Sequence, residues 1–395
     1  MTIGASVLFE PTVIRGMKLA NRFVRSATWE GLAGPEGGVT PELAGLYARF
    51  ARGRVGLIIS SHAFVTPEGR AGSRQLGVHD DSMMPGLRSL AAAVHEAGGA
   101  IALQIAHAGL WASPGPVPGT AAGAVAAAEA AQPLGPSVRQ TESGTLGREM
   151  SLADIAAVTQ AFAAAAARAK AAGCDAVQIH GAHGYLLSEF LSPLFNTRED
   201  EYGGTVANRT RLVVEVTAAI RAVVGPDYPV LIKLNSEDFV PGGLSVDDML
   251  ESAALVAGAG VDAIELSGGT SLSGDLGPIR TRRGIPQERE AYYEEAALRL
   301  KKKVRVAVML VGGIRSFEEA ERLVAAGYTD YIALSRPFIC EPDLVARWET
   351  GDRSPSGCRS DNRCFYKGLK GEGMSCVHAK RAGSPGRSGR PAAAN

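Results

Sequence analysis

The chain has 395 residues, of which 46% are hydrophobic and 21% are charged, a composition typical of a globular protein with a large core. Lys and Arg together number 41 and Asp and Glu also number 41, so the formal net charge is zero. The sequence has neither the basic excess nor the basic stripe that is typical of nucleic-acid-binding proteins. No apolar run reaches the roughly 18 residues of a membrane span, and the first residues do not read as a secretion signal.

Short apolar segments alternate with longer helical patterns along the chain. Several of these segments, such as GLIIS and VLIKL, are continuous apolar runs, as in strands buried on both faces of a sheet. Eight alternating units predict a (β/α)8 barrel, with a doubly wound sheet as the alternative. The predicted strands are Arg22–Ala27, Val55–Ser61, Ala100–Ala106, Ala176–His180, Val230–Leu234, Ala263–Leu266, Val306–Val311 and Tyr331–Leu334.

Serine residues precede three of the helical patterns. The stretch from Ser316 to Glu319 reads as a capping box, and the stretches that begin at Ser151 and Ser245 read as weaker versions of it. Glycines such as Gly173 follow the patterns as stop signals.

Two regions are additional to the eight strand–helix units of a minimal barrel. Residues 108–150, an insertion after the third strand, are rich in Gly, Pro, Ala and Ser, and we expect them over the active-site face. Beyond the barrel we expect a cysteine-containing extension over 349–380 and a disordered tail over 381–395. One barrel domain over 1–348 therefore replaces the two or three domains that length alone suggests.

Catalytic groups in a barrel come from the carboxyl ends of its strands. Four of the seven histidines follow predicted strands: His62, His107, His180 and His183. The last two, three residues apart, could share a metal, but nothing nearby supplies a convincing further ligand, so hydrogen bonding to a ligand oxyanion is favoured. Tyr185, two residues on, carries a hydroxyl that can donate a proton.

The later strands carry features suited to an anionic ligand. Gly312 and Gly313 precede a helical pattern, where backbone N–H groups meet the positive end of a helix dipole, and Arg336 adds charged donors. This is the usual phosphate position in barrels, although a tight turn could also need the glycines. Lys233, inside an apolar strand, reads either as a Schiff-base lysine or as a cation beside an anionic ligand.

Ten stretches match one family in order, and the chain resembles the old yellow enzyme family, the FMN-dependent NADH:flavin oxidoreductases and ene-reductases. The resemblance covers roughly residues 7 to 348, and the run HGAHGYLL, FLSP, EYGG and NR in that order is highly specific. The stretches are Leu8–Pro11, Asn21–Thr28, Gln104–Gly109, Gln178–Leu187, Phe190–Pro193, Asp200–Gly204, Asn208–Arg209, Ile232–Asn235, Val311–Ile314 and Ser335–Arg336.

The resemblance implies two sets of site residues. Lys233 would stand near N1 and the C2 carbonyl of the flavin, where a cation stabilises the reduced ring, and this disfavours the Schiff-base reading. Ala27 and Thr28 would line the ring, and Gln104 would hydrogen-bond its pyrimidine. The residues that would bind FMN are Ala27, Thr28, Ser61, Gln104, Lys233, Gly312, Gly313, Ser335 and Arg336. The residues that would contact the substrate are Trp29, His180, His183 and Tyr185.

The resemblance also implies a ping-pong reaction. NADH or NADPH would reduce the flavin at N5, and an activated alkene of the enone or enoate type, or a similar acceptor, would then take the hydride. His180 and His183 would polarise the acceptor's oxygen, and Tyr185 would be the proton donor. The alternatives are an oxidative demethylase or dehydrogenase on the same barrel, a cofactor-free lyase using Lys233, and a non-catalytic flavin-binding protein.

The cysteines differ from the pattern of longer family members, which carry four that bind a [4Fe–4S] cluster before a second domain. Here Cys358, Cys364 and Cys376 match with a shortened spacing, and Asp361 occupies one expected cysteine position. We therefore expect neither the cluster nor another metal, and no second domain. The odd total of five cysteines favours a reduced, cytoplasmic setting over disulfides. The expected partner is a small-molecule substrate, with a homo-oligomer left open.

Overall fold

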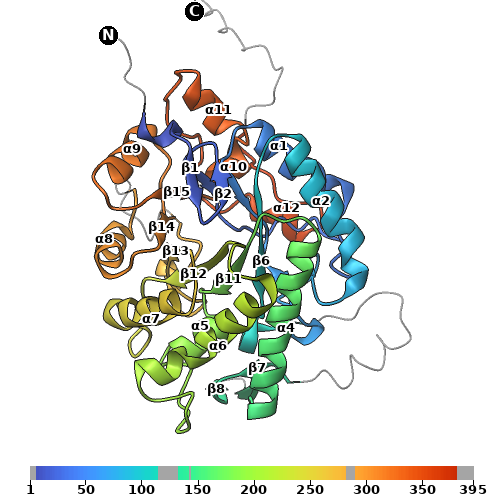
Figure 1. The fold of residues 1–395 in the computed structure, drawn as a ribbon, viewed down its shortest axis with the longest axis vertical. Helices are drawn as coiled ribbons and strands as arrows, with labels where there is room; N and C mark the ends of the chain where they lie inside the picture. The colour runs from blue at the N-terminus through green and yellow to red at the C-terminus, as the bar shows by residue number, and fades with distance from the viewer. Residues whose placement is uncertain (1–5, 114–131, 142–143, 282–289, 380–395) are drawn as a thin grey trace, which may run out of the picture.

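Eight parallel strands close into a barrel in the computed structural model, which describes residues 6–113, 132–141, 144–281 and 290–379 (Figure 1). Neighbouring strands pair in chain order, and the last pairs with the first, since Ile332 of the eighth is in register with Phe23 of the first. The predicted (β/α)8 barrel is therefore confirmed, and the doubly wound sheet is excluded. The strands are β3 (Phe23–Arg25), β4 (Leu57–Ile59), β6 (Ile101–Ala106), β11 (Ala176–Gly181), β12 (Val230–Asn235), β13 (Ala263–Ser267), β14 (Ala307–Leu310) and β15 (Tyr331–Leu334).

Helices surround the barrel in Figure 1. The longer ones are α1 (Pro41–Arg52), α2 (Met84–Glu96), α4 (Leu152–Ala171), α6 (Val206–Val224), α7 (Val246–Gly258), α8 (Glu294–Lys303) and α9 (Phe317–Ala325). Shorter ones are α5 (Leu186–Leu191), α10 (Arg336–Cys340), α11 (Leu344–Glu349) and α12 (Phe365–Leu369). None of the helices in the part of the chain described here is both long and apolar enough to cross a membrane.

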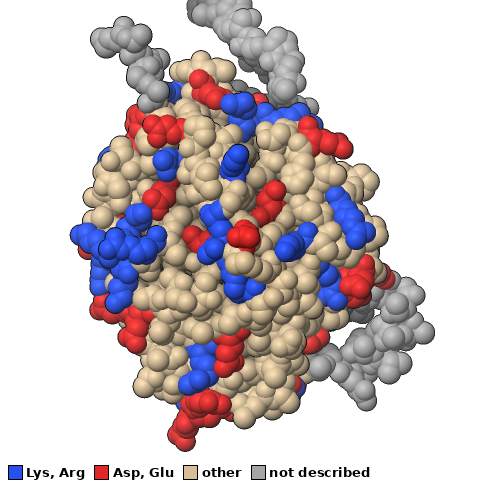
Figure 2. All heavy atoms as spheres, in the orientation of Figure 1, with Lys and Arg blue, Asp and Glu red and all other residues tan. Residues whose placement is uncertain are grey.

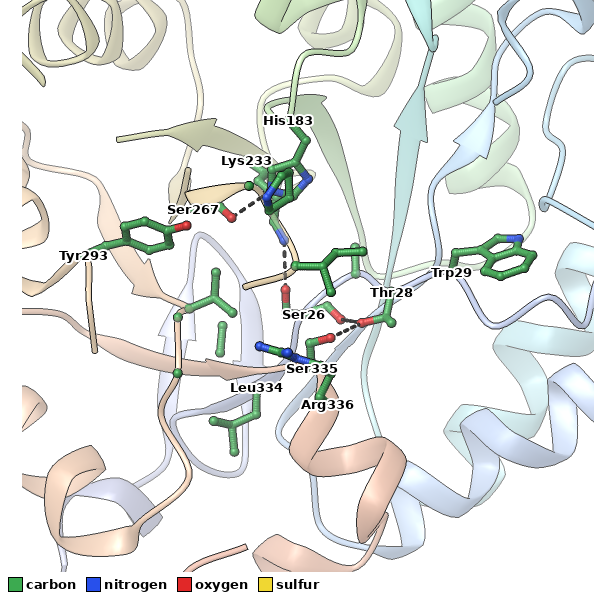
Figure 3. Close-up of a pocket in the computed structure, with 18 of the residues that line it drawn as sticks. Ser26, Thr28, Trp29, His183, Lys233, Ser267, Tyr293, Leu334, Ser335 and Arg336 are labelled. Atoms are coloured by element: carbon green, nitrogen blue, oxygen red, sulfur yellow. Dashed lines mark hydrogen bonds between the residues drawn. The ribbon is translucent and has the colours of Figure 1, made fainter. Parts of the chain in front are cut away.

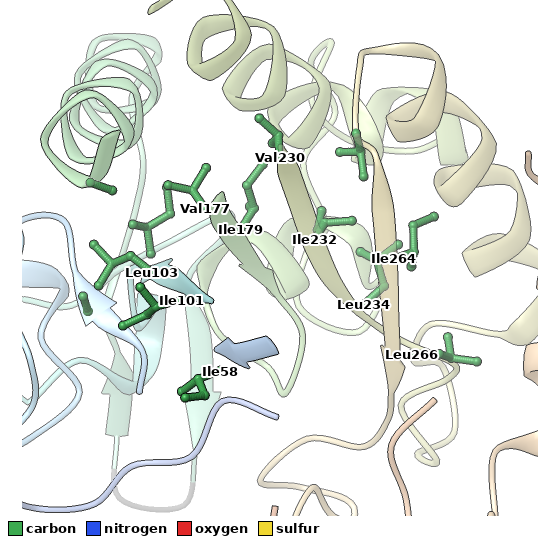
Figure 4. Packing of buried hydrophobic residues seen from close by; sticks show 14 of the residues in the cluster. Ile58, Ile101, Leu103, Val177, Ile179, Val230, Ile232, Leu234, Ile264 and Leu266 are labelled. Carbon is green, nitrogen blue, oxygen red and sulfur yellow. The ribbon is translucent and has the colours of Figure 1, made fainter. Parts of the chain in front are cut away.

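Successive residues of each strand point to opposite faces, and this alternation divides the buried side chains into two clusters. One cluster, which includes Ile58, Ile179 and Ile232, packs between the strands and the surrounding helices (Figure 4). The second includes alternate residues such as Leu57 and Leu231 together with a hairpin of β1 (Thr12–Ile14) and β2 (Met17–Leu19). The barrel interior is therefore a packed core.

The helix starts differ from the expected order of capping strength. Ser151 and Asp154 form a complete capping box on α4, and Ser245 caps α7 through its side chain. The hydroxyl of Ser316, predicted as the best cap, makes no capping bond to α9 but donates to Glu290, 3.0 Å away. That prediction was wrong because a carboxylate distant in sequence takes the place of the local partner.

The described part of the insertion forms short strands beside α5. These strands are β7 (Leu134–Gly135), β8 (Arg139–Thr141), β9 (Gly144–Leu146) and β10 (Arg148–Glu149). The Nη1 atom of Arg198 donates to the carbonyl oxygens of Pro136 and Met150, at 3.0 and 2.7 Å, and ties the insertion to the loop after α5. Residues 114–131 and 142–143 of the insertion lie outside the described residues.

The extension after the barrel turns back onto it. Trp348 at the end of the barrel is fully buried against Phe23 and Phe317, and the backbone N–H of Met374 donates to the carbonyl of Glu30 at 2.7 Å. The segment before residue 380 is thus packed beside the loop that follows β3. The predicted disordered tail, 381–395, lies outside the described residues.

Candidate active site

A cavity of about 510 Å³ opens at the carboxyl ends of the barrel strands, and residues within or shortly after each of the eight strands line it. Every residue predicted for the site lines this cavity except Ser61. Ser61 is buried beside it, and its backbone N–H donates to the hydroxyl of Tyr47 at 2.7 Å. His62, the next residue, lines the cavity, and the sequence places it among the strand-end histidines without a specific role. The described part of the insertion contributes no lining residue.

Lys233 is part of a buried chain of polar side chains, and Figure 3 shows its contact with Ser26. Its Nζ donates to Oγ of Ser26 at 2.8 Å and lies 3.0 Å from Oε1 of Glu265. Glu265 accepts from Gln178, which in turn accepts from Gln104, at 2.8 and 2.7 Å. Each of the two cavity residues is thus held by a partner on the next strand: Lys233 by Glu265 on β13, and Gln104 by Gln178 on β11.

Glu265 was not predicted, although the signal that singled out Lys233 applies to it too. Both are charged residues within short apolar strands, and the two occupy the same register position on neighbouring strands β12 and β13. Since a buried charge needs a partner, a carboxylate in AIELS and an ammonium in VLIKL could have been matched.

Three histidines and a tyrosine gather on the side of the cavity near β11. The ring of His180 lies 5.2 Å from that of His183, 5.0 Å from that of Tyr185 and 6.2 Å from that of His62, measured between centroids. Nδ1 of His180 is buried and has no hydrogen-bond partner among the described residues. A buried, unpaired ring nitrogen beside a cavity is suited to binding a ligand oxygen.

His183 is held in an unusual backbone conformation. Its φ is +67°, in the left-handed region, which costs free energy for a residue with a side chain. The side chain of Asn235 accepts from the backbone N–H of His183 at 3.0 Å, and Nε2 of His183 lies 2.7 Å from Oγ of Ser267 (Figure 3). The strained turn and the two bonds together fix the imidazole at the cavity wall.

Burial controls the ionisation of this group. It lowers the pKa of His62 to about 4, with the charge of Lys233 acting in the same direction. The pKa values of His180 and His183 also lie well below the usual value, chiefly because of burial. Burial raises the pKa of Tyr185 to about 12. Near neutral pH the histidines are therefore uncharged and Tyr185 keeps its proton, so all four can take part in neutral hydrogen bonds.

The opposite end of the cavity contains Gly312 and Gly313. Both have positive φ, +132° and +77°, and a Cβ on either would lie 2.8 Å from the ring of Tyr292. The close approach of this ring gives the glycines a structural reason that is separate from any role toward a phosphate. Arg336, at the start of α10, lines the same end.

The sequence predicts an anionic ligand at the start of α9, but a side chain of the protein occupies this position. The side chain of Glu290 accepts hydrogen bonds from the backbone N–H groups of Arg315 and Ser316, at 2.9 and 3.0 Å. A carboxylate is thus bound where the helix dipole favours negative charge. A phosphate at this end of the cavity would depend on the glycine turn and on the start of α10.

Thr28 and Ser335, which are predicted to bind different parts of the cofactor, are in contact with each other. Oγ1 of Thr28 lies 2.7 Å from Oγ of Ser335, and it donates to the carbonyl of Ser26 at 2.9 Å (Figure 3). The contact is possible because β3 and β15 are neighbours in the closed barrel. Trp29 lies at the far edge of this view.

The barrel itself adds a fourth thiol to the three in the extension. Cys340 of α10 lies beside Cys376, and Cys358, Cys364 and Cys376 line one small cavity of about 10 Å³. Asp361 is bound to His378 at 2.7 Å rather than to the thiols. No three His, Cys, Asp or Glu side chains in the described ranges are arranged to hold a metal ion. Asp361, which occupies one expected cysteine position, therefore does not act as a ligand beside the thiols.

FMN, by contrast, fits the donors of the main cavity. The ammonium of Lys233 and the amide of Gln104 can meet the polar edge of a flavin ring, and Arg336 can meet a phosphate. The cavity volume lies within the range of small-molecule sites.

Charge over the face of the molecule shown in Figure 2 is mixed, with Lys and Arg interspersed among Asp and Glu, and no single-sign region dominates it.

Known proteins share this architecture. The chain is 36% identical over 338 residues to an NADPH dehydrogenase from Geobacillus sp. (strain WCH70). The match covers 85% of this chain and 92% of that protein. It is 36% identical over 348 residues to an NADH oxidase from Thermoanaerobacter brockii, covering 87% of this chain but 51% of that protein, so it spans about half of that relative's length.

A solved structure of an old yellow enzyme homologue from Zymomonas mobilis superposes with a TM-score of 0.72 at 27% identity, covering 89% of this chain and 95% of that one. The family model for the NADH:flavin oxidoreductase / NADH oxidase family matches residues 7–354. Both findings agree with the motifs read from the sequence. The chain therefore belongs to the NADH:flavin oxidoreductase family, that of the old yellow enzymes.

Proposed function

We propose that the chain is an FMN-dependent NAD(P)H oxidoreductase that reduces an activated alkene, of the enone or enoate type, or a similar oxygen-bearing acceptor. FMN, when bound, supplies the hydride chemistry between NAD(P)H and the acceptor. The observation that carries the proposal is one cavity in which the Lys233 ammonium faces the same space as uncharged His180 and His183 and protonated Tyr185.

The chain's own groups divide between the two ligands. For the cofactor, we assign Lys233 and Gln104 to the flavin ring, Arg336 with the glycine turn to the phosphate, and Ala27, Thr28 and Ser335 to the wall between them. Lys233 is neutralised in part by Glu265, so it presents a fixed, oriented ammonium rather than an isolated charge. That arrangement suits hydrogen bonding to an electron-rich ring edge without the full cost of an unpaired buried cation.

For the substrate, we assign His180 and His183 to the acceptor's oxygen and Tyr185 to the proton. His180 has the buried, unpaired Nδ1, and His183 is oriented by Ser267. Neutral donors aimed at an oxygen stabilise negative charge that develops there during hydride addition. Tyr185, whose pKa is raised to about 12, stays protonated near neutral pH and can donate its proton to the substrate. Trp29 bounds the substrate side of the cavity.

The test is an anaerobic titration of the purified, flavin-loaded protein. NADH and NADPH are added separately, and bleaching of the flavin absorbance is followed. The reduced protein is then mixed with cyclohexenone, with an unsaturated carboxylate ester and with a nitroalkene. Bleaching by either nucleotide and reoxidation by at least one acceptor, with the saturated product detected, is the expected result.

Each alternative has its own outcome in this experiment. Protein that binds no flavin, yet cleaves a carbon–carbon bond in a Lys233-dependent way, would point to a lyase. Bleaching by an amine substrate in the absence of nucleotide, together with failure of both nucleotides, would point to an oxidative dehydrogenase. A bound flavin that neither nucleotide bleaches would point to a non-catalytic flavin protein.

A further inference from the structure

Arg336 reaches the cavity with its guanidinium already fixed by two segments distant in sequence. Its Nη1 donates to Oδ1 of Asn362 at 2.8 Å and to the backbone oxygen of Arg280 at 2.7 Å. Asn362 belongs to the extension beyond the barrel, and Arg280 to the loop after β13. A long, flexible side chain that would otherwise sample many rotamers is therefore held in one place.

Asn362 is itself anchored on the opposite side. Its Nδ2 donates to the backbone oxygen of Ile279 at 2.9 Å, so one amide group joins the extension, the β13 loop and Arg336. Its φ is +59°, in the left-handed region that Asn tolerates better than most residues with a side chain. The backbone oxygen of Asn362 accepts from the N–H of Phe365 at 3.1 Å, which starts α12.

The rest of the extension stands beside this contact as part of the cavity wall. Cys358, Ser360 and Phe365 line the same cavity as Arg336. Farther along, a Cβ on Gly368 would lie 3.1 Å from the ring of Trp29, and Met374 bonds the backbone of Glu30. The extension is thus attached to the barrel on both sides of α12.

We propose that Asn362 is a positioning residue that presets the Arg336 guanidinium for the phosphate of the cofactor. This inference rests on the proposed function, because it assumes that Arg336 meets the FMN phosphate. A donor that is fixed before binding loses less rotamer freedom when the ligand arrives, so affinity for the phosphate rises without a contact between Asn362 and the ligand. The extension therefore serves the cofactor site through Asn362.

The experiment compares FMN with riboflavin, which has the same ring and no phosphate. Both are titrated into apoprotein, with quenching of flavin fluorescence as the readout. The variant is Asn362→Gly, because glycine accepts the positive φ and removes only the side chain. We expect the dissociation constant for FMN to rise up to about tenfold, as for the ordering of one long side chain on binding, and that for riboflavin to stay unchanged. Lys367→Ala, an exposed position in α12, is the matched control.

A second variant keeps the result interpretable. In an Arg336→Met background, Asn362→Gly should have no further effect on FMN, because the residue through which it acts is gone. Equal weakening of FMN and riboflavin by Asn362→Gly, or an unchanged affinity for both, would overturn the proposal. Failure of the wild-type protein to bind FMN more tightly than riboflavin would instead count against the phosphate site and the proposed function.

Discussion

The ammonium of Lys233 lies 3.0 Å from the carboxylate of Glu265, and the two side chains are 2% and 0% exposed. They face each other because β12 and β13 pair in a register that sets these two positions side by side. Inside a barrel core, either charge without the other would be left in a poorly solvated environment. The pair is therefore a stability requirement as well as part of the cavity.

Removing both members should cost less than the sum of the two single losses. We expect Glu265→Gln and Lys233→Met each to lower the free energy of unfolding of the apoprotein by about 3 kcal/mol. The double variant should lose clearly less than the sum, because no uncompensated buried charge remains in it. Urea denaturation of the four proteins measures this directly. Additive losses would show that the two charges are not coupled.

Stability should fall as the pH is lowered below about 6.5, the ordinary histidine value. Burial lowers the pKa of His107 to about 4, and burial with the charge of Lys233 does the same for His62. Between pH 6.5 and 4 the unfolded chain thus binds protons that the folded chain does not, so acid favours unfolding.

The expected loss is about 2 kcal/mol for each of these histidines between pH 7.5 and 5. Urea unfolding at the two pH values measures it. His107→Gln should reduce the difference between the two pH values, whatever it does to stability at pH 7.5. An equal difference in wild type and variant would show that His107 is accessible to protons in the folded state.

The barrel was predictable because its signal is repeated. Each of the eight strands is an apolar run between helical patterns, and buried parallel strands leave that pattern in any sequence. Most of the cavity lining followed from the same logic, since residues after strands meet at one end. Ser61 does not line the cavity and its neighbour His62 does, because a shift of one position decides which neighbour faces the cavity.

Contacts between distant segments were not predictable. Glu290 takes the start of α9, Cys340 joins the thiols of the extension, and Asn362 reaches Arg336. None of these partners is marked by spacing or periodicity, because each depends on how loops cross after the barrel has closed. The failed cap at Ser316 has the same origin.

Tyr185 should affect only one half of the catalytic cycle. Tyr185→Phe removes the hydroxyl and keeps the ring beside His180, so packing changes little. We expect the rate of flavin bleaching by NAD(P)H to stay within about twofold and reoxidation by an enone to slow at least tenfold, as for loss of a proton donor. Stopped-flow absorbance separates the two steps.

Tyr366→Phe, at a position that is 62% exposed, is the control and should change neither rate. An unchanged reoxidation rate in Tyr185→Phe would remove Tyr185 from the proton-donor role.

Two glycine-to-alanine substitutions should have opposite effects. At Gly313 the added Cβ would lie 2.8 Å from the Tyr292 ring at a φ of +77°, so Gly313→Ala combines a clash with backbone strain, and we expect a loss of about 2 kcal/mol or more. At Gly45, within α1, nothing lies within 4 Å of the added Cβ, and alanine should stabilise the helix by about 0.5–1 kcal/mol. Thermal unfolding of both apoproteins tests the pair. If Tyr292 is the obstacle, Tyr292→Ala should restore part of the loss in Gly313→Ala, whereas no recovery would assign the whole cost to the backbone.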